Sequence, residues 1–484
     1  MISKVFNEEN ELLPFKPIIY VVCLALAFRS SILVLNLYLD NSPTWGFLPR
    51  TAIAIAWSDF GRLLLPENFE SLYGTTLEAS LKTWYLNDRG LTILYVLIDK
   101  AFGHVTYFQI QVFQLIIDSL MVLPAMGVAK RVAGPTGAIV AGVAYALFLP
   151  QAQMTVSPDY NGWLGCAMIT MIWIAVLLIE ARKAGIILCL FSALVIVNFI
   201  GNEFRSVVAL FSFGAAGWFW LVSIGAQRSL LLPKYRWKKI GMFVAAGMFV
   251  FMITSSINYI SRGEISPIRS SLGHAFFTGV GQYPNPLGMT DLDSAPADWY
   301  VRETGVTDIN YSLNTEYNEW LMERAKEFVS DYPVLYASMV VRRAWRILFP
   351  NMAFTVVTDI LSYARSPRQL ELAEMRKSLV AEHGWLSVTA LTTILKADPA
   401  YIFGLCWRVL LLIILPIGLF SAIWLSRSRG AAVFATLPLA YGIITLSFVY
   451  VTPPVVTGIH AAVLPVSAAG LFLLFCRAKE MYSS

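Results

Sequence analysis

Carboxylates and guanidinium groups that could carry acid–base chemistry and anion binding stand at the ends of apolar runs. Asp40 directly follows the first run, Asp59 lies in IAWSDFGRLLLP, and Asp159 lies in SPDYNG between two later runs. Glu203 and Arg205 follow in GNEFRS, at the end of another run. Ionised groups at the edge of hydrocarbon are expensive unless they are paired or hydrated. If these groups share one membrane face, they indicate a wet cavity that holds a general base and a clamp for an anion.

Other polar residues add to this set, and most candidates also have a simpler structural explanation. Asp159 could cap the helix that follows it, and Arg205 could extend toward lipid headgroups. The arginines of LYASMVVRRAWRILFP could anchor an amphipathic helix at the membrane surface. A histidine at a helix start is equally compatible with a structural role. The further candidates are Tyr160, Arg29, Arg342, Arg343 and His460.

The elements that position these residues must be membrane-spanning helices. Of the 484 residues, 57% are hydrophobic and 14% are charged, whereas a soluble domain has roughly 25% charged residues. Many apolar runs approach the ~20 residues that are needed to cross the hydrocarbon. The sequence therefore predicts an all-α polytopic membrane protein with about ten transmembrane helices. The expected spans are 17–38, 105–128, 135–153, 161–180, 184–201, 206–225, 239–260, 403–425, 431–450 and 458–476.

Basic residues predict how the chain is oriented in the membrane. Loops rich in Lys and Arg fall at every second turn between the expected spans, and the positive-inside rule assigns that side to the cytoplasm. Examples are Lys130, Arg131, Arg182, Lys183, Arg427, Arg429, Arg477 and Lys479. Both termini are then cytoplasmic. These loops also account for the net charge of +5, which gives no reason to expect nucleic acid as a partner.

Three regions follow from this topology. Residues 1–260 form a transmembrane core with a first exterior loop at 39–104, residues 261–402 form an exterior region with interfacial helices, and residues 403–484 form C-terminal transmembrane helices. The stretch 90–103 is too short and too charged to span, so we expect it to lie in the interface. GHAFFTGVGQYPNPLG is expected to be an ordered exterior loop over the cavity, because its glycines lack the strand–helix setting of a nucleotide loop.

Seven stretches, in their order along the chain, carry a resemblance to a known family. They are AFRSSILVLNLYLD, RGLTILYVLIDKAFG, AKRVAGPTGAIVAGVAYALFLPQAQM, SPDYNG, GNEFRSVVALF, EFVSDYPVLYASMVVRRAWRILFP and VTPPVVTGIHAAVLPVSAAGLFLL. Together they cover nearly the whole chain, and their order and spacing carry more weight than any one of them. In these features the sequence resembles the GT-C superfamily of integral-membrane glycosyltransferases, such as the aminoarabinose transferases and the protein O-mannosyltransferases. It departs from the family pattern at Ser206 and His460, where the family has proline and arginine.

The resemblance implies a GT-C-like fold and an inverting transfer of a sugar from a polyprenyl-phosphate donor. The acceptor would be a glycan, lipid or protein on the exterior face of a bacterial inner membrane. Asp59 or Asp40 would be the base, and Asp159 would orient the acceptor or bind a divalent cation such as Mg²⁺ or Mn²⁺. The remaining substrate-binding residues would be Arg205, Arg29, Arg342 and Arg343 at the phosphate, with Glu203, Tyr160 and His460 beside them.

Two other functions stay open at this stage. A transporter or flippase would show related halves with helices broken near the midplane, whereas here seven expected spans precede the long exterior region and three follow it. An enzyme similar to an O-antigen ligase or polymerase would also use lipid-linked sugars. Asp118, inside the second run, is expected to face the bundle interior and to pair with Ser119 or with a neighbouring helix. A proton or ion path through Asp118 is the alternative.

Overall fold

Helices are the regular elements throughout the described part of the chain. The computed structural model describes residues 15–40, 89–103, 105–156, 160–205, 208, 210–225, 233–262, 265, 272–290, 294–306, 315–348, 374–375, 378–379, 382, 387–397, 399–426, 429–451 and 453–483. No strand occurs within these ranges. The predicted all-α fold class is therefore confirmed.

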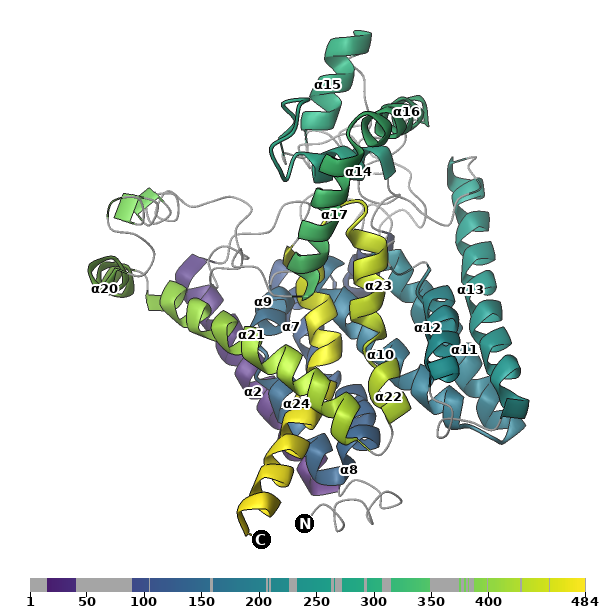
Figure 1. Cartoon of the computed structure of the whole chain (residues 1–484), viewed down its shortest axis with the longest axis vertical. Helices are drawn as coiled ribbons and strands as arrows, with labels where there is room; N and C mark the ends of the chain where they lie inside the picture. The colour runs from purple at the N-terminus through teal and green to yellow at the C-terminus, as the bar shows by residue number, and fades with distance from the viewer. Residues whose placement is uncertain are drawn as a thin grey trace.

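The larger part of the molecule is a helical bundle (Figure 1). Its helices are α2 (Phe15–Asp40), α6 (Arg89–Phe102), α7 (Tyr107–Leu120), α8 (Val122–Ala146), α9 (Leu149–Val156), α10 (Tyr160–Glu180), α11 (Ala184–Phe204), α12 (Phe211–Gly225), α13 (Pro233–Arg262), α20 (Val388–Ala397), α21 (Pro399–Leu425), α22 (Arg429–Phe434), α23 (Leu437–Leu446) and α24 (Pro453–Ser483). Among the described residues, six helical segments are long and apolar enough to cross a membrane, and shorter apolar helices accompany them. These helices therefore have the architecture of a polytopic membrane protein.

One of the six segments, Tyr107–Ala146, is a hairpin of two spans rather than one. It begins with a capping box, in which Thr106 and Gln109 bond to each other's backbone N–H. Within α8 the backbone reverses at Gly134, whose φ of 70° favours glycine. The two halves of α8 then lie against each other, because a Cβ added at Gly142 would meet the Met126 side chain at 2.7 Å. The shorter apolar helices Phe211–Ser223, Val409–Leu425 and Gly430–Leu446 are the candidates for three further passes, which would bring the described chain to the ten that the sequence predicts.

The turns of the bundle alternate between two sides. On one side Arg131 forms an ion pair with Glu180 at 2.9 Å, and Lys239 donates to Ala181 O at 2.8 Å. Ser426 donates to Val132 O at 2.9 Å on the same side. The chain around Arg131, Ala181, Lys239 and Ser426, at four of the turns predicted to share one side, therefore lies together. Which side faces the cytoplasm stays a prediction.

The opposite side carries a helical lobe, and we call it the lobe side. The lobe consists of α14 (Leu272–Val280), α15 (Ala295–Thr304), α16 (Thr315–Asp331) and α17 (Pro333–Leu348), and it stands at the top of Figure 1. An aromatic core that includes Phe277, Tyr300, Tyr317 and Phe328 holds it together. The lobe core is separate from the main core of the bundle, so the lobe has a hydrophobic interior of its own.

Two expectations for this region need correction. Residues 273–280 belong to helix α14, so only the second half of GHAFFTGVGQYPNPLG is a loop. The sequence predicts that the amphipathic helix α17 lies in the membrane interface, but one face of this helix packs against the bundle. It buries Arg343 and Ile347 and contacts α23 and α24. Its buried face is thus a joint between the lobe and the bundle, while Val341 and Trp345 lie on the exposed face.

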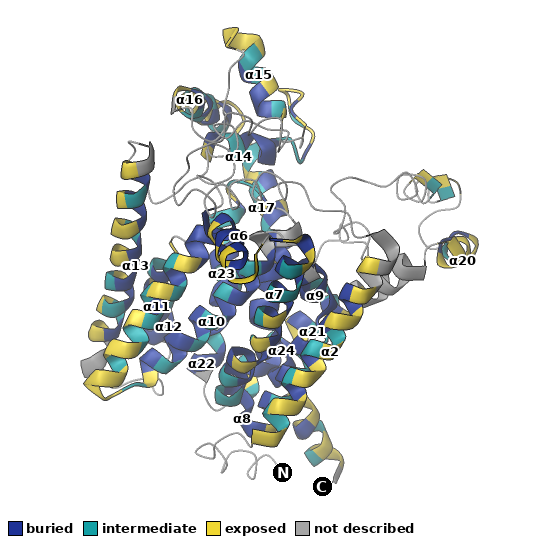
Figure 2. Ribbon diagram, turned by 180° about the vertical axis from the view of Figure 1, so that it is seen from behind, coloured by how far each residue is buried: buried dark blue, intermediate teal, exposed yellow. Residues whose placement is uncertain are grey.

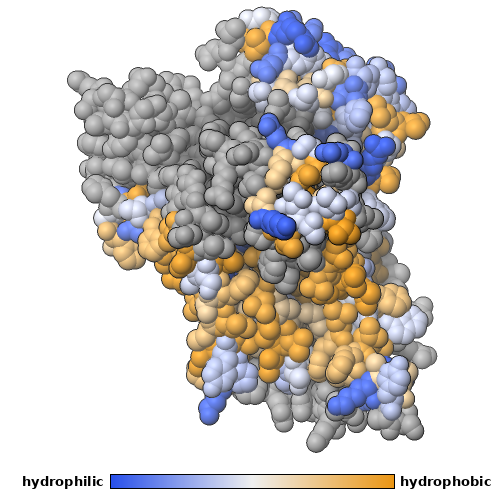
Figure 3. Space-filling model, turned by 90° about the vertical axis from the view of Figure 1, so that its left-hand side faces the viewer, coloured by the Kyte–Doolittle hydropathy of each residue, from blue (hydrophilic) through white to orange (hydrophobic). Residues whose placement is uncertain are grey.

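The surface of the bundle is apolar where lipid would cover it. Exposed residues follow the outer faces of α11 and α13 (Figure 2), and those on α11 include Ile186, Leu188 and Ile196. Figure 3 shows the apolar band across the bundle, with hydrophilic residues on the lobe above it. This distribution is what a helical membrane protein with one large extramembrane lobe requires.

Candidate functional site

The most unusual polar group at the joint between lobe and bundle is a set of three arginines around one tyrosine. The guanidinium carbons of Arg342, Arg343 and Arg346 lie 5.6, 5.7 and 4.8 Å from the centre of the Tyr283 ring. Distances of this size allow a cation–π interaction. We call Arg342, Arg343 and Arg346 the arginine cluster. The sequence predicts two of its members, Arg342 and Arg343, as phosphate ligands.

Arg343 is the buried member of the arginine cluster, with 0% of its surface exposed. Its Nη1 donates to Ser447 O at 3.1 Å, but its Nε and Nη2 have no partner in the part of the chain that the structure describes. Burial lowers the pKa of Arg343, and the nearby Tyr283 and Tyr336 act in the opposite direction. Arginine nevertheless stays protonated. A buried charge with unmade hydrogen bonds is costly. This site is therefore suited to an anion that accepts hydrogen bonds from Nε and Nη2.

A short loop brings Tyr283 to the arginine cluster. The Asn285 amide Nδ2 donates to Tyr283 O at 2.9 Å and to Met289 O at 2.8 Å, and its Oδ1 accepts from Met289 N at 3.0 Å. Gln282 Nε2 donates to Val451 O at 2.7 Å, next to the start of α24. Nothing in the sequence of this loop indicates that its tyrosine faces α17, so sequence reasoning missed Tyr283.

An apolar pocket lies one helical turn further along α17. Its lining residues are Leu348, Leu415, Pro416, Leu419, Leu439, His460 and Val463. His460 is the polar member, and its Nε2–H donates to Ile347 O at 2.8 Å. Since His460 is buried inside α24, it belongs to the joint between α17 and the bundle rather than to an open rim. Its predicted role in substrate binding is untested.

A second polar cluster joins α6 to α11 and α13 on the lobe side. Arg89 Nε donates to Glu203 at 2.9 Å, and Arg89 Nη2 donates to Asn258 at 2.9 Å. A Cβ added at Gly90 would meet the backbone of Glu203 at 2.8 Å, so α6 packs directly onto the end of α11. Glu203 is thus engaged in fixing α6. Arg205 follows half-buried at the end of α11, and the phosphate-binding role predicted for it stays a prediction.

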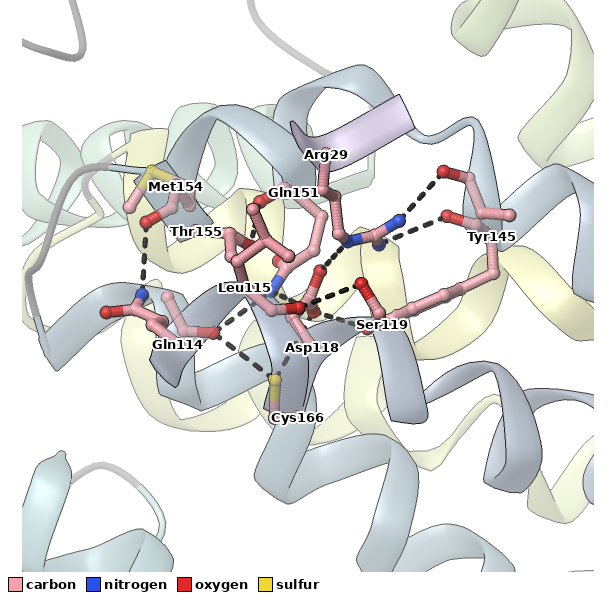
Figure 4. Close-up of polar contacts among 12 residues, drawn as sticks. Arg29, Gln114, Leu115, Asp118, Ser119, Tyr145, Gln151, Met154, Thr155 and Cys166 are labelled. Atoms are coloured by element: carbon pink, nitrogen blue, oxygen red, sulfur yellow. Dashed lines mark hydrogen bonds and ion pairs between the residues drawn. The ribbon is translucent and has the colours of Figure 1, made fainter. Parts of the chain in front are cut away.

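A third polar cluster lies inside the bundle, around Asp118 (Figure 4). Arg29 of α2 forms an ion pair with Asp118 of α7, and both side chains are almost fully buried. Tyr145, Gln151 and Cys166 also donate to Asp118, at 2.9, 3.0 and 3.3 Å. Five helices therefore meet at one carboxylate.

The contacts of this third cluster show which of the two predicted partners Asp118 has. Its partner is on a neighbouring helix, as predicted, while Ser119 donates to Leu115 O instead. Arg29 Nη1 also donates to Ala146 O at 2.8 Å. Because its N–H groups bond to Asp118 and Ala146 O, Arg29 joins neighbouring helices of the bundle. The phosphate-binding role predicted for it stays a prediction.

The side chains of the three predicted catalytic acids lie outside the part of the chain that the structure describes. Asp59 and Asp159 lie outside the described residues, and of Asp40 and Tyr160 only the backbone is described, at the end of α2 and the start of α10. No group of three or more His, Cys, Asp or Glu that could hold a metal ion occurs within the described ranges. The divalent cation that Asp159 could bind therefore stays a prediction.

Comparisons with known proteins give a distant structural likeness. No protein-family model matches the chain, and no curated protein does. Among solved structures, the Archaeoglobus fulgidus oligosaccharyltransferase, tethered with an acceptor peptide containing the NVT sequon, aligns with 95% of this chain at 12% identity and a TM-score of 0.41. The chain matches only 50% of that protein's length, and a likeness of this size says nothing of donor, acceptor or mechanism.

Proposed function

We propose that this protein is a membrane glycosyltransferase that moves a sugar from a polyprenyl-phosphate donor to an acceptor on the non-cytoplasmic face. The observation that carries the proposal is the arginine cluster beside an apolar pocket on the same helix, α17. Arg343 supplies two buried donor nitrogens, Nε and Nη2, without a partner among the described residues. A lipid phosphate has the matching chemistry, because it joins an anionic head to a long apolar tail.

In the proposed reaction the acceptor's oxygen or nitrogen bonds to the anomeric carbon of the sugar. The bond between that carbon and the phosphate oxygen breaks, and its electron pair leaves with the lipid phosphate. Attack from the opposite face inverts the anomeric centre. The arginine cluster would stabilise the charge that develops on the departing phosphate. Asp59 or Asp40 would take the acceptor's proton, and Asp159 would orient the acceptor.

Arg343→Met tests the phosphate contact. We expect the donor KM to rise by about 10- to 100-fold, because hydrogen bonds to a charged group contribute roughly 1.5–3 kcal/mol. The measurement is transfer from a defined polyprenyl-phosphate sugar by the protein in lipid nanodiscs. Arg324→Met is the matched control, since Arg324 is a lobe arginine that pairs with Glu327 at the surface. Equal donor KM values for the two variants would remove Arg343 from the donor site.

Cells that lack the protein provide the test of the function itself. Mass spectrometry of lipid-linked sugars and envelope glycans should show an accumulating donor and a missing sugar, and the two together would identify both substrates. A flippase would bind the same amphiphile but would leave its sugar bond intact. If purified protein moves the donor across a bilayer without transferring sugar to any acceptor, the enzyme assignment is wrong.

A further inference from the structure

We propose that Tyr283 is a positioning residue that holds the arginine cluster together as one anion-binding unit, and that the Asn285 loop holds Tyr283 in place. The proposal rests on the proposed function in one respect, which is that the anion is the phosphate of a lipid-linked donor. It assigns a role to the loop of residues 281–290, whose sequence resembles no nucleotide-binding motif.

The first step is electrostatic. Arg342, Arg343 and Arg346 bring three like charges to one ring, and none of them pairs with a described carboxylate. Like charges this close repel each other. The face of the Tyr283 ring attracts cations, and all three guanidinium carbons lie within 5.7 Å of its centre. The ring therefore offsets part of the repulsion and leaves the remaining charge for an anion.

The second step concerns the free hydrogen-bonding groups. The Tyr283 hydroxyl is buried and has no partner among the described residues, as is also true of Nε and Nη2 of Arg343. Buried polar groups are satisfied in most proteins, so unsatisfied groups need an explanation. Three donors on two residues whose side chains are in cation–π contact suit the oxygen atoms of a phosphate.

The third step is how the loop is held. Asn285 bonds the backbone on both sides of the turn, at Val280 O, Tyr283 O and Met289 N. The helix before the loop is held just as closely, because a Cβ added at Gly279 would lie 1.9 Å from Val449 O. The backbone around Tyr283 is thus held by Asn285 and by the segment between α23 and α24, to which Arg343 also donates at Ser447 O.

Variants of Tyr283 separate the ring from the hydroxyl. Tyr283→Phe keeps the ring and removes only the hydroxyl donor, so it should raise the Kd for geranylgeranyl monophosphate by about 3-fold. Tyr283→Leu removes the ring and should raise that Kd about 10-fold, which corresponds to the loss of cation–π contacts. Asn285→Ala keeps Tyr283 but releases the loop, and should raise the Kd by about 3-fold or more. Binding is measured by calorimetry on the full-length protein in nanodiscs.

Geranylgeraniol, which has the same tail without the phosphate, is the control ligand. A positioning role predicts that Tyr283→Leu leaves the Kd for geranylgeraniol unchanged, whereas a merely structural role predicts that both ligands weaken together. Equal loss of both ligands, an unchanged Kd for the phosphate, or no binding of the phosphate to the unmodified protein would each overturn the proposal. If Tyr283→Leu does not fold, Asn285→Ala carries the same comparison.

The two proposals can fail separately. Calorimetry needs no sugar transfer, so an intact Tyr283 effect in a protein that transfers no sugar would contradict only the glycosyltransferase assignment. A protein that transfers sugar from a lipid-phosphate donor, and does so with an unchanged donor KM in Tyr283→Leu, would contradict only the role of Tyr283.

Discussion

Asp118→Asn should lower the free energy of unfolding by about 3 kcal/mol, because it leaves the Arg29 guanidinium as an uncompensated charge inside the bundle. The amide keeps an oxygen that can still accept from Tyr145 and Gln151, so the main change is the loss of the negative charge. Arg29 cannot reach water in this structure, since 0% of its surface is exposed. The positive charge of Arg29, which pairs with Asp118 in the unmodified protein, therefore destabilises Asp118→Asn.

The double variant Arg29→Gln with Asp118→Asn should recover most of this loss. A buried ion pair is not necessarily more stable than a neutral replacement, because both charges must first be removed from water. Two amides can hydrogen-bond to each other and to Ala146 O without either charge. The midpoint of SDS-induced unfolding compares the stability of the unmodified protein, Asp118→Asn and the double variant. If the double variant is no more stable than Asp118→Asn, the two residues act independently and the pairing has no energetic meaning.

The double variant also tests the phosphate-binding role predicted for Arg29. A structural Arg29 predicts that the folded double variant keeps the donor KM of the unmodified protein. A donor KM that rises as much as in Arg343→Met would return Arg29 to the donor site. Both outcomes are measured with the transfer assay described for Arg343.

The sequence is informative about this protein wherever a residue type is costly in its surroundings. An acid at Asp118 within an apolar run must have a partner, so the sequence predicts one on another helix. It does not predict that this partner is Arg29. The two residues are separated by many positions, and pairing across helices depends on how the spans pack. The alternating basic loops predict the two sides of the bundle for a similar reason, since charge near lipid has few allowed positions.

The candidate site was predicted less completely. The basic amphipathic pattern of α17 identifies Arg342 and Arg343, but it does not show that Arg342 is exposed and Arg343 fully buried. That difference comes from the packing of α17 on α23 and α24. Tyr283 carries no comparable signal, because a tyrosine in a glycine- and proline-rich loop is not costly anywhere near a surface. Residues 41–88 of the predicted first exterior loop, with Asp59, lie outside the described residues, so the catalytic role of Asp59 stays a prediction.

Gly470→Ala should also destabilise the bundle by about 3 kcal/mol, since overpacking against a rigid neighbour typically costs about 1–3 kcal/mol and occasionally more. A Cβ at this position would lie 1.9 Å from Gly418 O of α21 and 2.5 Å from Ala422 N. Both contacts are with backbone atoms, which cannot rotate away as a side chain can. Small residues allow this close approach of helices, as is common where membrane helices pack.

The contact at Gly470 is reinforced one turn away. Ser467 donates to Ile414 O at 2.8 Å, and a Cβ added at Gly418 would meet Ser467 O at 2.3 Å. An inserted methyl group must therefore push α21 and α24 apart and weaken this hydrogen bond. Because Leu415 and Val463 of these two helices line the pocket beside the arginine cluster, a shift between them should also change donor binding.

Gly217→Ala in α12 is the matched control, because a Cβ at Gly217 would meet nothing within 4 Å. Alanine is the better helix former by roughly 0.5–1 kcal/mol, so this variant should be as stable as the unmodified protein or slightly more stable. SDS-induced unfolding again provides the comparison. If Gly470→Ala and Gly217→Ala unfold at the same midpoint, α21 and α24 do not approach as closely as 1.9 Å implies. The pocket between them would then be wider than the structure shows, which would weaken the case for a bound lipid tail.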